Sequence, residues 1–346
     1  MVVALSAIFV GLLIGAVGNI VHLPYAILQP GPASNVLGQH TGDNGVTSDL
    51  ISISGKQTYP ATGSLDFTTV RVNGGPGFPV SVWDVVSAWI SGDQEVYPVD
   101  VLFPPTQSAD DVAAENTAEM VDSQQEAAAV ALEKLGYPVT QQVTVGQVSP
   151  DAPSGDVLKV GDVITSVGGV KVTGAASVRA EIQKGKPGSV LAIAVQRDSK
   201  PVTVQAKTGA ADGRTVLGIV LGLKYVFPFT VKIDVGNVGG PSAGLMFSLG
   251  IYDKLTEGSL TGGATIAGTG TIDGTGAVGP IGGIRQKMVG ARAAGATWFL
   301  APADNCKEVV DHVPGGMQAV KVATFDEAEA AVTKIGKGET TGLPHC

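Results

Sequence analysis

The chain has 346 residues, a length that suits two or three domains, each large enough to bury its own core. Hydrophobic residues make up 44% of it and charged residues 15%, which indicates a globular rather than a disordered protein. The net charge is -9 and no basic cluster occurs, so the composition argues against a nucleic-acid-binding surface. With 48 glycines and 5% aromatics, it favours tight turns and small-residue contacts over a large aromatic pocket.

The N-terminal segment, "MVVALSAIFVGLLIGAVGNIV", has no charged side chain through Val21. A run of about 20 apolar residues is long enough to cross a bilayer as a helix, whereas the core of a signal peptide is usually shorter. We therefore expect one transmembrane anchor over residues 1–22. A cleaved signal sequence is the alternative, although no clear cleavage site follows the apolar run.

The two cysteines, Cys306 and Cys346, lack the clustered spacing of a zinc site. A disulfide between them would close a loop of about 40 residues and would stabilise the fold by about 4 kcal/mol. It would persist only in an oxidising compartment and would place the body of the protein outside the cytoplasm. Two unrelated free thiols are the alternative.

Residues 50–105 alternate short strand-like runs with turns and one helix pattern, and no chemistry is apparent in them. From Ala109 to Leu135 the chain is rich in helix-forming residues, begins acidic and ends near Lys134 and Gly136, which predicts a long helix.

Residues 140–207 contain four short β-branched runs separated by turns, together with one helix pattern, which predicts a compact β-rich module. The phrases "VSPDAPSGDVLKVGDVITSVGGVKV" and "GKPGSVLAIAVQRDSKPVTV" resemble the PDZ domains of bacterial membrane and periplasmic proteases. The resemblance implies that an extended peptide, often a protein C-terminus, binds at a sheet edge. "LGYPV" at residues 135–139 is a candidate for the carboxylate-binding loop.

After a polar linker at residues 208–215, strand-like runs alternate with helix patterns at 242–255, 284–294 and 325–334, which predicts an α/β domain. The chain contains no G-x-x-x-x-G-K-[ST] sequence, so no nucleotide-driven motor is expected.

Ser242 lies in "GGPSAG" at the start of an apolar helix pattern and requires a base to become a nucleophile. The G-x-S-x-G pattern also fits the nucleophile elbow of an α/β-hydrolase, which would need His312 with Asp273 or Asp304. That fold needs several strands before the serine, where the PDZ-like module lies. The other candidate base is a buried lysine, because burial lowers the pKa of an amine. Lys287 qualifies, since it lies at the edge of the apolar helix stripe that begins at Ile284.

The phrases "GGPSAGLMFSLGIYDKL" and "IAGTGTIDGTGAVGPIGGIRQKMVGARAAGATWFLAPADN" are similar to the proteolytic domain of the Lon family, which uses a Ser/Lys catalytic pair. The resemblance implies that Ser242 is the nucleophile, Lys287 the general base and Thr269 a supporting residue that hydrogen-bonds the lysine. The oxyanion would meet the backbone amides of Ser242 and Ala243, and Gly240 and Ala243 would contact the oxyanion or the substrate backbone. The chain lacks the ATPase module of ATP-dependent Lon enzymes, and Gly239 stands where those enzymes often have an acidic residue.

The order of anchor, PDZ and Lon-type domain resembles membrane-anchored, PDZ-containing Lon-like proteases. We therefore expect an α/β (α+β) Lon-type proteolytic domain preceded by a β-rich PDZ domain and a transmembrane helix. The expected boundaries are 1–22 for the anchor, 23–115 for an N-terminal extracytoplasmic region, 116–209 for the PDZ-like domain with its preceding helix, 210–335 for the proteolytic domain and 336–346 for the tail.

The predicted activity is that of a single-pass membrane serine endopeptidase that needs no ATP and no cofactor or metal, with its catalytic domain outside the cytoplasm. Its partners would be protein or peptide substrates, recruited through their C-termini at the PDZ domain, and the resemblance implies a homo-oligomeric ring. The alternative from another class is a non-catalytic PDZ scaffold with a degenerate protease domain.

Overall fold

The computed structural model of the chain describes residues 9, 13, 15–41 and 45–346. It contains two compact units. The larger unit comprises Met1–Gly136 together with Phe229–Cys346, and the smaller unit comprises Tyr137–Pro228. The smaller unit is therefore an insertion in the sequence of the larger one, and the two are described separately.

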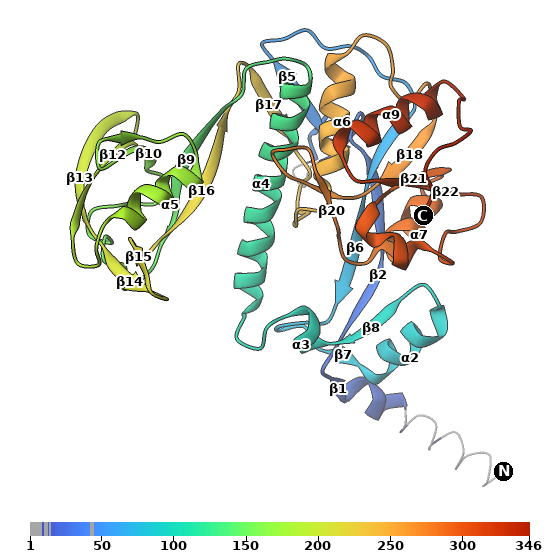
Figure 1. The fold of residues 1–346 in the computed structure, drawn as a ribbon. Helices are drawn as coiled ribbons and strands as arrows, with labels where there is room; N and C mark the ends of the chain where they lie inside the picture. Colours follow the sequence, from blue (N-terminus) through green and yellow to red (C-terminus); the bar gives the residue numbers. More distant parts are fainter. Residues whose placement is uncertain (1–8, 10–12, 14, 42–44) are drawn as a thin grey trace, which may run out of the picture. The chain divides into compact units, whose positions relative to one another are not determined.

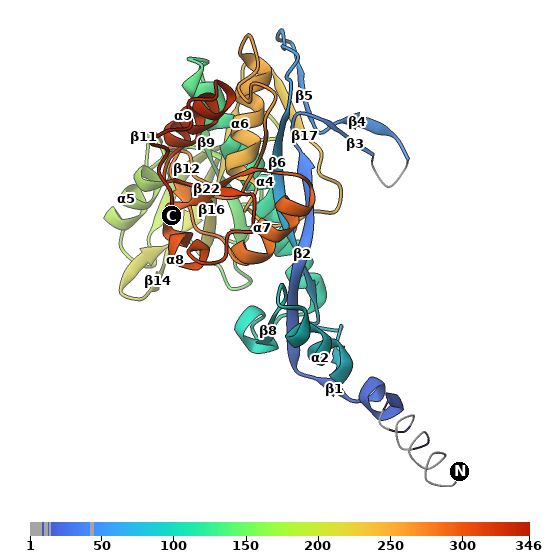
Figure 2. The same cartoon turned by 90° about the vertical axis from the view of Figure 1, so that its right-hand side faces the viewer.

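A six-stranded sheet forms the centre of the larger unit, with β2 and β6 as its longest strands (Figures 1 and 2). Strands β6, β18, β21 and β22 run parallel, whereas β2 pairs antiparallel with both β6 and β8. In sheet order the strands are β22 (Gln318–Val322), β21 (Trp298–Pro302), β18 (Thr265–Gly268), β6 (Ser64–Asn73), β2 (Tyr25–Asn35) and β8 (Glu95–Pro98). The N-terminal region 23–115 thus supplies half of the strands of the central sheet, and two of them, β6 and β8, lie in residues 50–105, where no chemistry was apparent.

Four two-stranded pairs complete the larger unit's strands: β1 (His22–Leu23) with β7 (Val80–Ser81), β3 (Gln39–Thr41) with β4 (Thr47–Asp49), β5 (Ile51–Ser54) with β17 (Thr230–Ile233), and β19 (Thr271–Ile272) with β20 (Val278–Gly279). The β5–β17 pair joins segments that lie before and after the inserted smaller unit.

The larger unit's helices are α2 (Val82–Ser91), α3 (Val99–Leu102), α4 (Ala109–Lys134), α6 (Gly244–Leu255), α7 (Ile284–Ala293), α8 (Cys306–Val309) and α9 (Phe325–Gly336), with a short 3-10 turn at Ala303–Asn305. The longer helices agree with the sequence patterns, whereas the two helices of four residues, α3 and α8, were not predicted. Helix α4 begins with a capping box, in which Ser108 and Asp111 satisfy each other's backbone amides. Helix α6 packs against α4, α9 and β6, and its Phe247 ring lies 5.5 Å from that of Phe67.

Helix α7 carries the predicted apolar stripe into the core. Ile284, Met288 and Ala291 are fully buried and pack with Phe299 of β21. On its other side α7 packs against β2 and β6. A Cβ at Gly290 would lie 2.3 Å from the carbonyl oxygen of Gly31, so this close approach of helix and strand requires glycine at position 290.

The smaller unit is a β-rich module with one helix, as the sequence predicts. Its main sheet has the order β13-β12-β10-β9-β16, with β11 pairing beside β10, so β16 is an edge strand. The elements are β9 (Thr140–Val148), β10 (Val163–Val167), β11 (Val170–Lys171), α5 (Ala175–Lys184), β12 (Val190–Arg197), β13 (Lys200–Lys207), β14 (Gly209–Ala211), β15 (Arg214–Val216) and β16 (Ile219–Val226). Its core includes Val143, Ile164 and Ile193.

The compact units divide the chain differently from the expected boundaries 116–209 and 210–335. Helix α4 belongs to the larger unit, and residues 208–215, expected as a linker, form most of the β14–β15 hairpin. The expected range 210–335 places "VLGIVLG" in the proteolytic domain, but its strand β16 pairs with β9 of the smaller unit. The sequence of a short strand does not indicate which sheet the strand joins, so the sequence alone could not assign β16 to its domain.

Cys306 and Cys346 form a disulfide across a sequence separation of 40 residues. The tail is further held by the amide of Lys321, which donates to the carbonyl oxygen of Pro344, and by burial of Leu343. Among residues 9, 13, 15–41 and 45–346, no helix is both long enough and apolar enough to cross a membrane. Most of the predicted anchor at residues 1–22 lies outside the described residues.

Candidate active site

Ser242 lies in the turn that leads from β17 into α6, directly after Pro241. Its carbonyl oxygen accepts hydrogen bonds from the amide of Gly270 at 2.9 Å and from the hydroxyl of Thr269 at 3.0 Å. The amide of Leu245, in the first turn of α6, donates in turn to the carbonyl oxygen of Gly270. Thr269 and Gly270, which follow β18, thus hold the backbone of Ser242 and the first turn of α6 by hydrogen bonds.

Lys287 reaches this serine from α7. Its Nζ lies 2.6 Å from the Oγ of Ser242 and 2.9 Å from the Oγ1 of Thr269, although these residues are 45 and 18 positions away in sequence. The Lys287 residue is 2% exposed and Thr269 is fully buried. Burial lowers the pKa of Lys287 from 10.5 to about 7, because desolvation disfavours the charged ammonium. A large part of the amine is therefore neutral near pH 7, with a lone pair that can accept the serine proton.

Helix α4 supports the backbone just before the serine. The amide of Gly240 donates to the carbonyl oxygen of Asn116 at 2.9 Å, and the Oγ of Ser123 donates to the carbonyl oxygen of Pro241 at 3.0 Å. A Cβ at Gly239 would lie 2.8 Å from the Cβ of Asn116, which leaves no space there for a larger side chain. An acidic residue at position 239 is therefore incompatible with α4 in this position.

These contacts correct one expectation. The amide of Gly240 is already bonded to Asn116, so Gly240 is not a free donor for an oxyanion. Within the described part of the chain, the amides of Ser242 and Ala243 have no protein acceptor, and both precede the first turn of α6. The two amides expected at the oxyanion, those of Ser242 and Ala243, are thus free to donate to it.

Ser242 and Lys287 open into a cleft of about 590 Å³. One wall is the Ser242 loop (residues 237–243). The other walls are residues 67–72 of β6, Leu102 and Phe103 at the end of α3, and Asn116 and Met120 of α4. The region before residue 121 therefore builds much of the site. Sequence reasoning missed this contribution. The available signal was Ser123, a polar residue at helical spacing with Met120 and Ala127, which the structure shows to be buried.

The alternative triad is not assembled. His312 is exposed, and its Nδ1 lies 2.8 Å from the carbonyl oxygen of Val310. The carboxylate of Asp273 accepts from the hydroxyl and amide of Thr275, in its own turn. Lys287, rather than a histidine, is bonded to the Oγ of Ser242. This geometry argues against the α/β-hydrolase interpretation.

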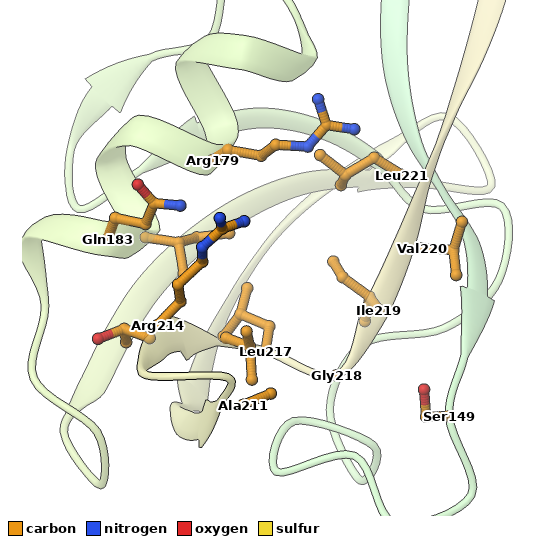
Figure 3. Close-up of a pocket in the computed structure, with 13 residues that line it drawn as sticks. Ser149, Arg179, Gln183, Ala211, Arg214, Leu217, Gly218, Ile219, Val220 and Leu221 are labelled. Carbon is orange, nitrogen blue, oxygen red and sulfur yellow. The ribbon is translucent and has the colours of Figure 1, made fainter.

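The smaller unit has its own groove, of about 470 Å³, between α5 and the edge strand β16 (Figure 3). Leu217 and Gly218, before β16, form its end. Their carbonyl oxygens accept from Ser154 and Ser149, whereas their amides donate to no acceptor among the described residues. Gly218 has a φ of 74°, which glycine adopts readily, and a short turn with two amides that lack such an acceptor suits an anion.

The candidate carboxylate loop at residues 135–139 stays a prediction, and it is not part of this groove. Leu135 ends α4 in the larger unit, and no residue of 135–139 lines the groove. Residues 216–219, "VLGI", line the groove instead, and the sequence signal that was missed is a glycine directly before a β-branched strand.

Comparison with known families identifies two domains in the chain. Residues 231–334 match the family model of the Lon protease (S16) C-terminal proteolytic domain, and residues 117–208 match that of the PDZ domain. A Lon-type proteolytic domain and a PDZ domain are therefore present. The matched ranges lie close to the expected boundaries, although the compact units extend the PDZ domain to residue 228 and place residues before 137 with the proteolytic domain.

Relatives with curated names are Lon proteases. The chain is 28% identical over 175 residues to Lon protease 1 of Bacillus subtilis, covering 47% of this chain and 21% of that protein. It is 30% identical over 180 residues to the Lon protease of Azospirillum brasilense, covering 49% and 20%. The match thus spans about a fifth of the length of these relatives.

A solved PDZ domain of an SdrC-like protein from Listeria monocytogenes is 31% identical, with a TM-score of 0.22, and the match covers 23% of this chain and 85% of that one. The proteolytic-domain match and the Lon relatives together support a serine protease.

Proposed function

We propose that the protein is an ATP-independent, Lon-like serine endopeptidase in which Ser242 is the nucleophile and Lys287 the general base. The observation that carries this proposal is the 2.6 Å approach of the Lys287 Nζ to the Ser242 Oγ in a buried site where the pKa of the amine is about 7. A neutral amine at this distance has the geometry and the basicity that proton transfer requires.

In the first half of the reaction, the Oγ of Ser242 attacks the peptide carbonyl carbon while its proton passes to the Nζ of Lys287. The oxyanion of the tetrahedral intermediate accepts hydrogen bonds from the amides of Ser242 and Ala243. Lys287 then donates its proton to the leaving nitrogen, the C–N bond breaks and an acyl-enzyme forms. A water molecule releases the acyl group, with Lys287 again accepting and returning a proton.

Thr269 positions both partners. Its Oγ1 lies 2.9 Å from the lysine Nζ, and its hydroxyl donates to the carbonyl oxygen of Ser242. Because the Thr269 hydroxyl donates its proton to the carbonyl oxygen of Ser242, a lone pair of its Oγ1 accepts a hydrogen bond from the Nζ of Lys287. The amine's own lone pair is thereby directed to the serine hydroxyl.

The test compares cleavage of fluorescein-labelled casein, without ATP, by the full-length wild type, Ser242→Ala, Lys287→Gln and His312→Ala. We expect the first two variants to lose activity and His312→Ala to keep it. Equal cleavage by all four proteins would refute the dyad, loss on His312→Ala would favour the triad, and the absence of cleavage by the wild type would favour a non-catalytic scaffold.

The proposal gives the smaller unit the role of recruiting substrates. Extended C-terminal segments would add to the free edge of β16, with the terminal carboxylate at the amides of Leu217 and Gly218. A peptide with a free C-terminus should bind, and the same peptide with a C-terminal amide should bind more weakly. Equal binding of the two would contradict carboxylate recognition.

The proposal also assigns the protein to the cell membrane, with one N-terminal span and the catalytic domain outside the cytoplasm. It is supported by the uncharged sequence through Val21 and by the disulfide between Cys306 and Cys346. Recovery of the full chain from the soluble fraction of carbonate-washed cells would contradict the span. Sedimentation of the detergent-solubilised chain tests the homo-oligomeric ring, which a monomer would exclude.

A further inference from the structure

The charge of the smaller unit is opposite to that of the whole chain. Residues 137–228 contain seven Lys and three Arg against five Asp and one Glu, a net charge of +4 within a chain of net charge -9. An electropositive unit in an acidic protein attracts acidic ligands and repels basic ones. The groove of this unit has the same bias, because it is lined by two arginines and by no carboxylate.

Arg179 on α5 and Arg214 on β15 are these two arginines (Figure 3). Neither forms an ion pair with a carboxylate among the described residues. Glu181, the acidic residue of α5, is paired with Lys184 at 2.6 Å instead. By contrast, Arg197 elsewhere in the unit is bound to Asp162 at 2.6 Å. The two groove guanidinium groups are thus available to a ligand, whereas the structural arginine is not.

The floor of the groove between these charges is apolar. Ile182, Leu217 and Ile219 line it, and Leu217 is 2% exposed. An apolar side chain at the end of a bound peptide fits beside Ile219, next to the free amides of Leu217 and Gly218. The groove therefore combines two amides suited to a carboxylate, an apolar subsite and two cations that are unpaired among the described residues.

The position of Arg179 indicates which ligand residue it meets. Figure 3 shows its side chain extending from α5 toward the β16 side of the groove, in the direction of Leu221. Leu221 is two residues beyond Ile219, and side chains two residues apart lie on the same face of a strand, about 7 Å apart. A ligand strand whose last residue lies beside Ile219 brings its third-last residue beside Leu221 and Arg179.

We propose that the groove selects protein C-termini that end in an apolar residue and carry Asp or Glu at the third-last position, with Arg179 as the residue that determines this preference. The inference rests on the proposed function of the groove. Arg214, three residues before Leu217, adds positive charge at the carboxylate end.

The experiment uses the full chain carrying Ser242→Ala, so that peptides are bound but not cleaved. Fluorescence anisotropy measures the affinity of three fluorescein-labelled heptapeptides that end in Val with a free carboxyl group and differ only in Glu, Gln or Lys at the third-last position. We expect the Glu peptide to bind about fivefold more tightly than the Gln peptide, the size of a well-formed exposed ion pair, and the Lys peptide to bind least.

Charge reversal identifies the residue. Arg179→Glu should invert the order, so that the Lys peptide binds better than the Glu peptide, while the affinity for the Gln peptide changes little. Lys171→Glu is the matched control: it makes the same change of charge at an exposed position of β11 that does not line the groove, and the original order should persist.

The outcomes separate the two proposals. If no free-carboxyl peptide binds, the proposed role of the groove fails and this inference fails with it. If the peptides bind with equal affinity, or if Arg179→Glu and Lys171→Glu change the order equally, the groove keeps its role and only the acidic preference is overturned.

Discussion

Replacing Lys287 with Met should stabilise the larger unit, by an amount that depends on pH. The pKa of the lysine is lowered from 10.5 to about 7 in the folded protein, so the unfolded chain binds more protons between these values. Each unit by which the pKa is lowered costs the folded state about 1.4 kcal/mol, so the full cost below pH 7 is about 5 kcal/mol. This cost shrinks as the pH rises and disappears above 10.5. Methionine has no such cost and nearly the same length.

The assay is urea unfolding of the full chain at pH 7 and pH 9.5, followed by tryptophan fluorescence. The three tryptophans, Trp83, Trp89 and Trp298, all lie in the larger unit, so the signal reports the unfolding of that unit. The stability difference between Lys287→Met and the wild type should be larger at pH 7 than at pH 9.5 by about 3 kcal/mol. Other titrating groups cancel in this difference. A difference that stays constant with pH would show that the folded lysine has an ordinary pKa and would refute the proposed base.

Four further outcomes are expected. The kcat for peptide cleavage should rise with pH through about 7 and then level off, because the base must be neutral; a flat profile would contradict it. Thr269→Val should lower kcat about 10- to 100-fold with little change in KM, since it removes the hydrogen bond that orients the amine. Ser123→Ala should destabilise the larger unit by about 1–3 kcal/mol and lower kcat, because the carbonyl oxygen of Pro241 loses its donor; unchanged values in urea unfolding and in the peptide assay would show that α4 does not support the site. Cys346→Ser should cost about 4 kcal/mol of tryptophan-monitored stability, and a reductant should then have no further effect.

Most of the helices could be predicted from sequence because their signals are local, and the contact between Ser242 and Lys287 could be predicted as well. Helix α7 has an apolar stripe at helical spacing, with Lys287 beside it, and α4 has a capping box, helix-forming residues and a final lysine. The pairing of Ser242 with Lys287 followed from two specific phrases rather than from periodicity. Periodicity alone left the lysine free to be an ordinary solvated residue.

The walls of the site could not be predicted, because they depend on pairings between distant segments. Residues 64–67 of β6 pair with residues 265–268 of β18, about 200 positions away, and nothing in either short strand identifies the other. The sequence of β16 likewise fits either neighbouring domain. Only its pairing with β9 assigns it to the PDZ domain.

The chemistry of the dyad explains why these distant segments matter. A lysine can act as a base near neutral pH only if water is excluded from it, and residues 231–334, the range that matches the Lon family model, do not supply all of that exclusion. Helix α7 packs against β2 and β6, with Gly290 in close contact with Gly31, and α4 fixes the Ser242 loop from the other side of the cleft. Packing throughout the larger unit therefore offsets the free-energy cost of burying Lys287. In the proposed mechanism, the strand pairs that join its two sequence segments across the inserted PDZ domain thus support the base as well as the fold.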